Sequence, residues 1–143
     1  MRSSVQMNMP QQIILKNLQR PKEINIGDDI EWLGNSFGFS AGRDTEGVTA
    51  QILQNVLEEV AGQGSTSTEN ISDELDLSVQ KVNYHLRTLV DSGFLCRERR
   101  LIFVRQGSVK SAVEEMRRDA NRIFDNLSRI AEEIDSALGF KNR

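Results

Sequence analysis

The last third of the chain carries the pattern that most restricts its fold. Nine apolar residues between Val109 and Ala137 are separated alternately by four and three residues. Because an α-helix turns once every ~3.6 residues, this spacing puts all nine on one side, as in helices that pair with another helix. We predict one helix from its cap at Ser108 to Gly139, roughly 45 Å long at about 1.5 Å per residue.

This apolar stripe predicts a protein–protein interface, because a single helix of that length cannot bury it alone. Phe124, Ala131 and Leu138 widen the stripe beyond what a two-stranded coiled coil needs, and a parallel pair would bring no opposite charges together along its flanks. We expect a symmetric homodimer whose helix packs on its twin and on another element, either the first helix or the N-terminal segment. Packing wholly within its own chain is the alternative. The predicted dimerisation residues are Val109, Val113, Met116, Ala120, Ile123, Phe124, Leu127, Ile130 and Ile134.

Two amphipathic helices are predicted between residues 44 and 77. Apolar residues recur every four positions from Val48 to Val60, and Asp44 or Thr45 would cap this helix. The break GQGSTST precedes TENISDELDL, which predicts a shorter helix with Thr68 as its cap. A third helix follows almost without a linker, because Ser78 is its expected N-cap. Two helices joined by so short a turn cross steeply, which is the helix-turn-helix arrangement.

The third helix, within SVQKVNYHLRTLVDSG, has one apolar and one polar face. Val82, Leu86 and Leu89 share a side at ~100° per residue, and Gly93 is the expected stop. The lone histidine, His85, falls on the flank of the apolar face, so a structural role is expected for it. The opposite side carries amide, phenol, hydroxyl and cationic groups: Gln80, Lys81, Asn83, Tyr84, Arg87 and Thr88.

The hydrophobic period changes in FLCRERRLIFVRQG. Leu95 and Arg97 alternate, and then Leu101 and Phe103, around a turn at residues 98–100. Period-two alternation on both sides of a turn predicts a small two-stranded hairpin. Its tip and ends carry four arginines: Arg97, Arg99, Arg100 and Arg105.

The net charge of −3 hides an uneven distribution. Residues 48–77 hold six acidic residues and no lysine or arginine, whereas residues 78–106 hold six basic and two acidic residues, a local charge of +4. Because a phosphate backbone responds to the local field, this distribution favours a nucleic-acid contact made by the third helix and the hairpin.

Three helices followed by a basic hairpin predict a winged helix. The stretch ISDELDLSVQKVNYHLRTLVDSGFL resembles the ArsR-like winged helix-turn-helix transcription regulators, particularly archaeal ones. The resemblance covers roughly residues 46–106 and is carried by Ser78, Val82, His85, Leu86, Leu89 and Gly93. It implies that the third helix enters the major groove of double-stranded DNA and that the wing contacts phosphates or the minor groove. ArsR-like metal sensors use cysteine and histidine clusters, which this sequence lacks, so no metal site is expected and the effector is left open.

The residue types on these two elements agree with DNA contact. Gln80 and Asn83 carry amides that can bond an adenine edge, while lysine and arginine at 81 and 87 can bond guanine or phosphate. The hairpin arginines would supply the salt-dependent part of the affinity, and Ser78 at the helix start could help to place a phosphate. The predicted DNA-binding residues are Ser78, Gln80, Lys81, Asn83, Tyr84, Arg87, Arg97, Arg99, Arg100 and Arg105.

Residues 1–43 match no motif. PQQIILKNLQR predicts a short helix between two prolines, and GDDIEWLGNSFGF predicts another with Asp28 as its cap, followed by a glycine-rich loop. Trp32, Phe37 and Phe39 lie close together in this region. They fit packing in the core or in a dimer interface, or a docking segment for another protein.

Several other classes of protein are disfavoured. One cysteine and one histidine allow neither an internal disulfide nor a Cys/His metal cluster. No glycine-rich phosphate loop or nucleophile–histidine–acid set is present, so we expect neither an enzyme nor a cofactor. No apolar run approaches the ~20 residues of a membrane helix, and the start lacks signal-peptide features. A cytoplasmic protein without membrane contact is expected.

The sequence thus predicts a mainly α fold with a small β-hairpin wing. We expect an N-terminal extension of unclear role (1–43), a winged helix DNA-binding domain (44–107) and a long dimerisation helix (108–143). The predicted function is a homodimeric, sequence-specific transcriptional regulator that binds a near-palindromic DNA site. The alternative is a winged-helix protein–protein interaction module or a subunit of a transcription or replication assembly.

Overall fold

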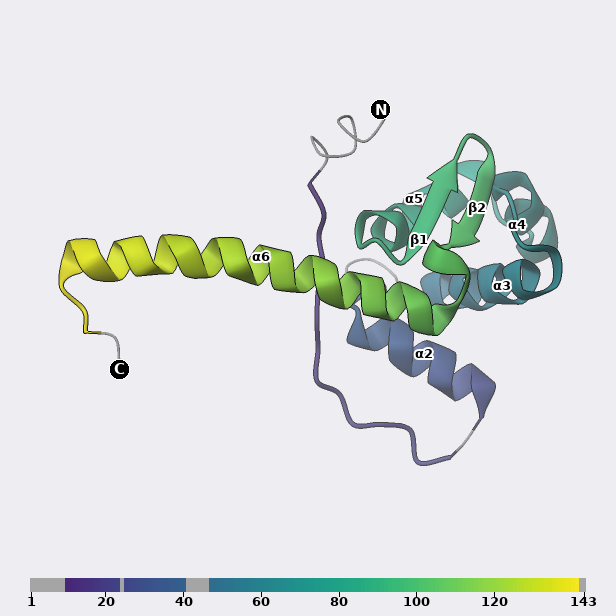
Figure 1. The fold of residues 1–143 in the computed structure, drawn as a ribbon. Helices are drawn as coiled ribbons and strands as arrows, with labels where there is room; N and C mark the ends of the chain where they lie inside the picture. The colour runs from purple at the N-terminus through teal and green to yellow at the C-terminus, as the bar shows by residue number, and fades with distance from the viewer. Residues whose placement is uncertain (1–9, 24, 41–46, 142–143) are drawn as a thin grey trace.

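The computed structural model describes residues 10–23, 25–40 and 47–141 of the 143-residue chain. They form a mainly helical fold with one antiparallel two-stranded hairpin, and a long helix extends away from the rest (Figure 1). This arrangement confirms the predicted winged helix-turn-helix fold. Its elements in chain order are α2 (Ile26–Ser36), α3 (Val48–Gln63), α4 (Thr68–Leu75), α5 (Val79–Asp91), β1 (Leu95–Glu98), β2 (Leu101–Val104), the 3₁₀ turn η1 (Arg105–Gly107) and α6 (Val109–Leu138).

One hydrophobic core joins α2 to α3, α4, α5 and the hairpin. The rings of Phe37, Phe39 and Phe94 meet in it, with centroids 5.4 Å apart for the first two and 5.8 Å apart for the last two. Such stacked and tilted ring pairs stabilise a core beyond the burial of their area. Phe37 and Phe39 are therefore core residues, which removes them from the docking segment considered above, while Trp32 is half-buried.

The starts of α5 and α4 follow from their capping side chains. Ser78 caps α5 as predicted, because its side chain accepts a hydrogen bond from the backbone amide of Lys81. The cap of α4 is Ser67 rather than Thr68. Ser67 has extended backbone angles, so its hydroxyl reaches the amide of Asn70, whereas Thr68 already lies in the first helical turn.

The starts of α2 and α3 also differ from the prediction. Asn25, not Asp28, caps α2: the Asn25 side chain accepts from the amide of Asp28, which belongs to the first turn. Helix α3 begins at Val48 and follows Gly47, which has a left-handed backbone. The caps predicted for α3, Asp44 and Thr45, lie outside the described residues.

The helix predicted for PQQIILKNLQR is wrong. Residues 10–20 form no regular secondary structure and run as an irregular segment past the ends of two helices. The amide of Gln12 donates to Asp91 O at 3.2 Å, at the end of α5, and the amide of Lys16 donates to Ser36 O at 2.8 Å, at the end of α2. Local propensity for a short helix therefore yields to hydrogen bonds with distant carbonyl groups.

The hairpin forms where the period-two pattern predicts it. Arg97 is paired with Ile102, and Ile102 and Val104 are buried, whereas Leu101 is 51% exposed. Ile102 and Val104 therefore form the inner face of β2. A shift of one residue would exchange the two faces of the strand and expose them.

Helix α6 has the predicted ends. The Ser108 side chain accepts from the Ser111 amide, and Gly139 closes the helix in the left-handed conformation. Its inner part packs on its own chain, where Ala112, Met116 and Asp119 are buried.

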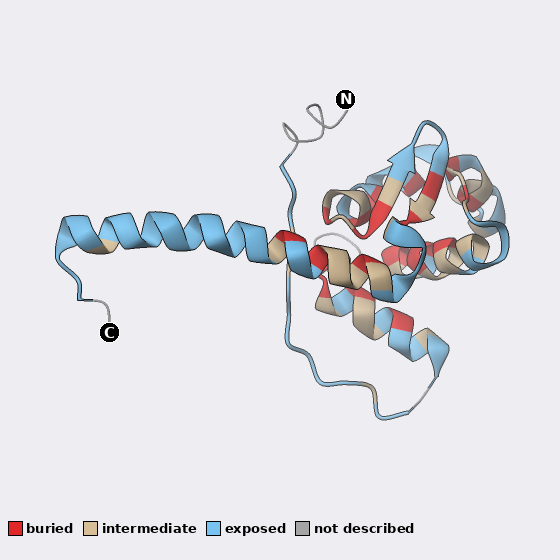
Figure 2. Cartoon of the chain, in the orientation of Figure 1, coloured by how far each residue is buried: buried red, intermediate tan, exposed pale blue. Residues whose placement is uncertain are grey.

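Beyond residue 120 the side chains of α6 are exposed, apart from half-buried Asp135 (Figure 2). The predicted dimerisation stripe therefore divides into two parts. Met116 is buried within its own chain and Val113 is half-buried against the core, so neither belongs to the exposed stripe. These contacts agree with the expectation that the helix also packs on another element.

Candidate nucleic-acid interface

The outer face of α5 presents polar and cationic side chains to solvent. Val82, Leu86 and Leu89 are fully buried on the inner face and fix the rotation of the helix. Tyr84 lies on the outer face with 58% of its area exposed. The exposed residues of this face that were predicted to contact DNA are Gln80, Lys81, Asn83, Tyr84 and Arg87.

His85 is a structural residue of α5. It is buried, and its Nδ1 atom is hydrogen-bonded to the hydroxyl of Thr49 on α3 at 2.8 Å. The ring of Tyr84 stands edge-on to the imidazole, with centroids 5.1 Å apart. His85 therefore links α5 to α3 through this hydrogen bond, and its ring packs against the exposed Tyr84.

The wing projects two arginines at its tip. The register pairs Glu98 with Leu101, so Arg99 and Arg100 form the two-residue turn, and both are exposed. Arg99 has φ of 59°, a left-handed conformation that favours glycine or asparagine. The turn thus holds a long cation where backbone geometry alone would select a small residue.

Arg97 links the wing to the two helices of the helix-turn-helix. Its Nη2 donates to Asn83 Oδ1 at 2.7 Å and to the hydroxyl of Thr68, and that hydroxyl donates to Asn83 Oδ1 at 3.1 Å. Because the amide oxygen of Asn83 is occupied, a bidentate contact of this residue with adenine first requires the bond to Arg97 to break. The link fixes the angle between β1 and α5.

Arg105 faces inward, away from the predicted DNA contacts. Its Nη1 lies 2.5 Å from Asp119 Oδ2, and its Nη2 lies 3.7 Å from Glu115 Oε1, both on α6. Since its charge is compensated within the chain, Arg105 is not among the side chains that we assign to DNA. Arg105 lies in η1, directly between β2 and α6, so the ion pair joins the end of the wing to the long helix.

Asp119 is the centre of this junction and was not among the predicted site residues. Burial opposes its ionisation, but hydrogen bonds from Arg105, Gln11 and Arg122 outweigh that effect and lower the pKa of Asp119 from 3.8 to about 2. The Asp119 carboxylate is 2% exposed. Its partners lie up to 108 residues away in sequence, so no local pattern predicts it.

Gly93 makes room for the junction. It has φ of 91°, and a Cβ atom there would lie 2.7 Å from Gln11 Nε2 and 2.8 Å from Arg105 Nη1. Gly93 O also accepts from Arg105 at 3.3 Å. The glycine predicted as a helix stop is therefore also required by the close approach of two side chains.

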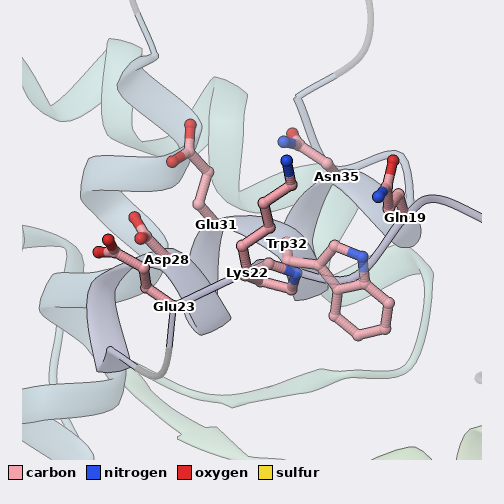
Figure 3. A pocket seen from close by; sticks show the side chains of 8 residues that line it. Gln19, Lys22, Glu23, Asp28, Glu31, Trp32 and Asn35 are labelled. Atoms are coloured by element: carbon pink, nitrogen blue, oxygen red, sulfur yellow. The ribbon is translucent and has the colours of Figure 1, made fainter.

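Two hollows are lined in part by Trp32, away from the exposed face of α5. The indole N–H donates to Leu18 O at 3.3 Å, and a shallow depression beside the ring is lined by polar side chains that include Lys22, Glu31 and Asn35 (Figure 3). The second hollow, of about 780 Å³, lies between α2 and α3 and has mostly apolar walls. It is open to solvent and contains no convergent set of catalytic groups.

Among the described residues, no group of three or more histidine, cysteine, aspartate or glutamate side chains is placed to hold a metal ion. No helix within the described ranges is both long and apolar enough to cross a membrane. Burial raises the pKa of the Cys96 thiol, which lowers its reactivity at neutral pH.

Residues 46–96 match the model of a protein family described as a helix-turn-helix domain. The match covers α3, α4, α5 and the beginning of β1. Comparisons with curated proteins and with solved structures find no match to the chain. The segment that carries the polar face of α5 is thus similar to a helix-turn-helix domain, a kind of domain typical of DNA-binding regulators.

Proposed function

We propose that the protein is a sequence-specific DNA-binding transcriptional regulator that acts as a homodimer in the cytoplasm. One observation carries the proposal: α5 exposes amide and cationic side chains beside a hairpin whose turn exposes two arginines. Both elements belong to or adjoin the segment that matches a helix-turn-helix domain. In this proposal residues 44–107 bind DNA, and the apolar stripe of residues 108–143 holds the dimer together.

In the proposed complex, α5 lies in the major groove. Gln80 and Arg87 then read base edges, with Lys81 near the backbone, and Tyr84 packs its ring against a base or sugar. Arg99 and Arg100 on the wing contact phosphates and supply a salt-dependent share of the affinity. Ser78 remains the cap of α5. In the proposed complex the N-terminus of α5 faces a phosphate of the DNA backbone.

A homodimer determines the form of the target. Two α5 helices related by a twofold axis read inverted half-sites on the same side of the duplex, separated by whole helical turns of about 34–36 Å. The proposed site is therefore near-palindromic. The exposed apolar residues of outer α6 motivate the dimer, because no other part of residues 10–23, 25–40 and 47–141 covers them.

The test is selection of bound fragments from the source genome by the purified full-length protein at two salt concentrations. We expect enrichment of a near-palindromic sequence, weaker at higher salt, and its loss in a Lys81→Ala/Arg87→Ala variant. Both substituted side chains are exposed, so the variant should keep its thermal stability. Glu69→Ala/Asp73→Ala, exposed on α4, is the matched control and should keep the enrichment.

Absence of enrichment with a folded dimer would contradict the proposal. Nuclease-resistant capture of a protein partner would then favour the alternative of a protein–protein interaction module. Enrichment that is equal in the intact protein and in the Lys81→Ala/Arg87→Ala variant would place the DNA contact elsewhere on the molecule.

A further inference from the structure

We propose that two chains pair through the outer part of α6 in an antiparallel arrangement, with the twofold axis between Ser128 and Arg129. This proposal rests on the homodimer proposed above and adds the orientation and the register of its helices. It follows from three properties of α6: where its apolar side chains are exposed, how its charges are distributed, and which residues remain free to pair.

The exposed stripe begins where the helix leaves its own domain. Met116 is 2% exposed, whereas Phe124, Leu127 and Ile130 are 62%, 57% and 53% exposed (Figure 2). An exposed stripe of this size is unfavourable in water, and monomeric proteins rarely carry one. A second copy is the occupant that offers a surface of the same length and spacing.

The charges of α6 change sign along its length. Residues 109–122 hold four basic and three acidic residues, a net charge of +1, and their arginines at 117, 118 and 122 also pair with carboxylates three residues earlier in the same helix. Residues 123–138 hold one basic and four acidic residues, a net charge of −3.

A parallel pair would place the acidic outer part of one helix beside the acidic outer part of the other. An antiparallel pair places the basic part of each helix beside the acidic part of the other, and it also opposes the two helix dipoles. The distribution of charge therefore selects the antiparallel orientation.

The register follows from the residues that are still exposed. When Ala120 lies opposite the partner's Ala137, Ile123 lies opposite the partner's Ile134 and Leu127 lies opposite the partner's Ile130. Small residues then close both ends of the interface and large residues fill its middle.

Two further observations favour this register. Phe124 falls near the partner's Ala131, so a large side chain meets a small one. A shift of one heptad toward the domain would require Ile134 to pack on the partner's Met116, which is already buried in its own chain.

The test measures distances between spin labels in the full-length dimer. Single cysteines replace Ser128 or Ser136 in a Cys96→Ser background, which removes the only native thiol. Both positions are exposed on the outer half of α6. In the proposed register the two labels at 128 are separated by little more than the interhelical distance of ~8–10 Å, and those at 136 by about 22 Å along the helix axis.

A short distance at 128 together with a long distance at 136 is the expected result. Short distances at both positions would show a parallel pair and overturn the proposal. Long distances or no dipolar coupling at both positions would show that the stripe is not the interface. The molar mass in solution then distinguishes a dimer that forms through another surface from a monomer. A monomer would also contradict the homodimer of the proposed function, whereas a dimer through another surface would contradict only the α6 pairing.

Discussion

At the scale of the residue, Arg99 holds a charge in a strained backbone position. A residue other than glycine in the left-handed region lowers stability by roughly 1–2 kcal/mol, and replacing it with glycine removes part of that cost. We predict that Arg99→Gly raises the free energy of unfolding by up to about 1 kcal/mol. The same change should lower the slope of log K against log salt for DNA binding by about 0.9, the loss of one phosphate contact.

The matched control for Arg99→Gly is Gln106→Gly. Gln106 also has a left-handed backbone, with φ of 62°, but it is uncharged and lies in η1 rather than at the wing tip. Chemical denaturation and salt titration of both variants separate the two effects. An unchanged salt slope in Arg99→Gly would mean that this arginine does not contact phosphate.

Asp119 makes the stability of the protein dependent on acid pH. Its pKa is about 2 in the folded chain and near 3.8 when unfolded, so its carboxylate stabilises the native state above about pH 4. This contribution, about 2 kcal/mol, is lost as the pH falls through the window from about 4 to about 2. We predict that Asp119→Asn lowers stability at pH 7 and removes this part of the acid dependence.

Chemical denaturation at several pH values measures the effect. Asp73→Asn removes an exposed carboxylate on α4 and serves as the control, with stability at pH 7 expected to remain within about 0.5 kcal/mol of the parent. If Asp119→Asn and the parent lose stability in parallel between pH 4 and 2, the ion pair with Arg105 does not carry the acid dependence.

At the scale of the element, the junction of α5, η1 and α6 depends on the space beside Gly93. We predict that Gly93→Ala destabilises the protein by about 2–3 kcal/mol, because the added methyl group introduces left-handed strain and displaces the ends of the Gln11 and Arg105 side chains from their hydrogen bonds to Asp119. Gly107→Ala is the matched control: its φ is 85°, but no atom lies within 4 Å of the added carbon. Chemical denaturation should show a loss for Gly107→Ala of about half or less. Equal losses would show that the junction adjusts without cost.

How far the sequence predicts an element depends on how local its determinants are. Helix α6 was predicted to its caps, because Ser108, Gly139 and the heptad spacing all lie within the helix itself. The irregular course of residues 10–20 was not, because its hydrogen bonds go to Ser36 and Asp91.

The same distinction holds in the candidate site. The exposed face of α5 follows from a local period, whereas the inward turn of Arg105 depends on Asp119, 14 residues away on another element. The link between Arg97 and Asn83 is likewise set by the packing of the wing on α5. Which of the exposed residues contact DNA is still a prediction.

At the scale of the whole molecule, the orientation of the proposed dimer predicts how its charges can be exchanged. Glu133→Lys/Asp135→Lys should weaken the dimer by on the order of tenfold, because the new lysines lie near the partner's Arg122 in the proposed register. Adding Arg122→Glu to the same chain should restore part of the affinity. Sedimentation at several protein concentrations measures both constants.

The exchange also tests orientation independently of the labels. In a parallel dimer the first double substitution would leave like charges beside like charges, and the dissociation constant would hardly change. Circular dichroism of each variant confirms that the helix itself is intact. Restoration by Arg122→Glu is the result that a general loss of folding cannot produce.

The exposed outer half of α6 has a consequence for the length of the DNA site. In an antiparallel pair the two winged-helix domains lie at opposite ends of the shared helical segment. The length of that segment therefore sets the distance between the two half-sites. Seven residues inserted at its centre would preserve the heptad pattern but move the domains apart by only about 10 Å, close to three base pairs, so the two α5 helices would no longer face the same side of the duplex. Three inserted heptads, about 32 Å, come close to one helical turn of DNA and should allow both half-sites to be bound again. The number of heptads in a protein helix would then decide which spacings between half-sites can be bound.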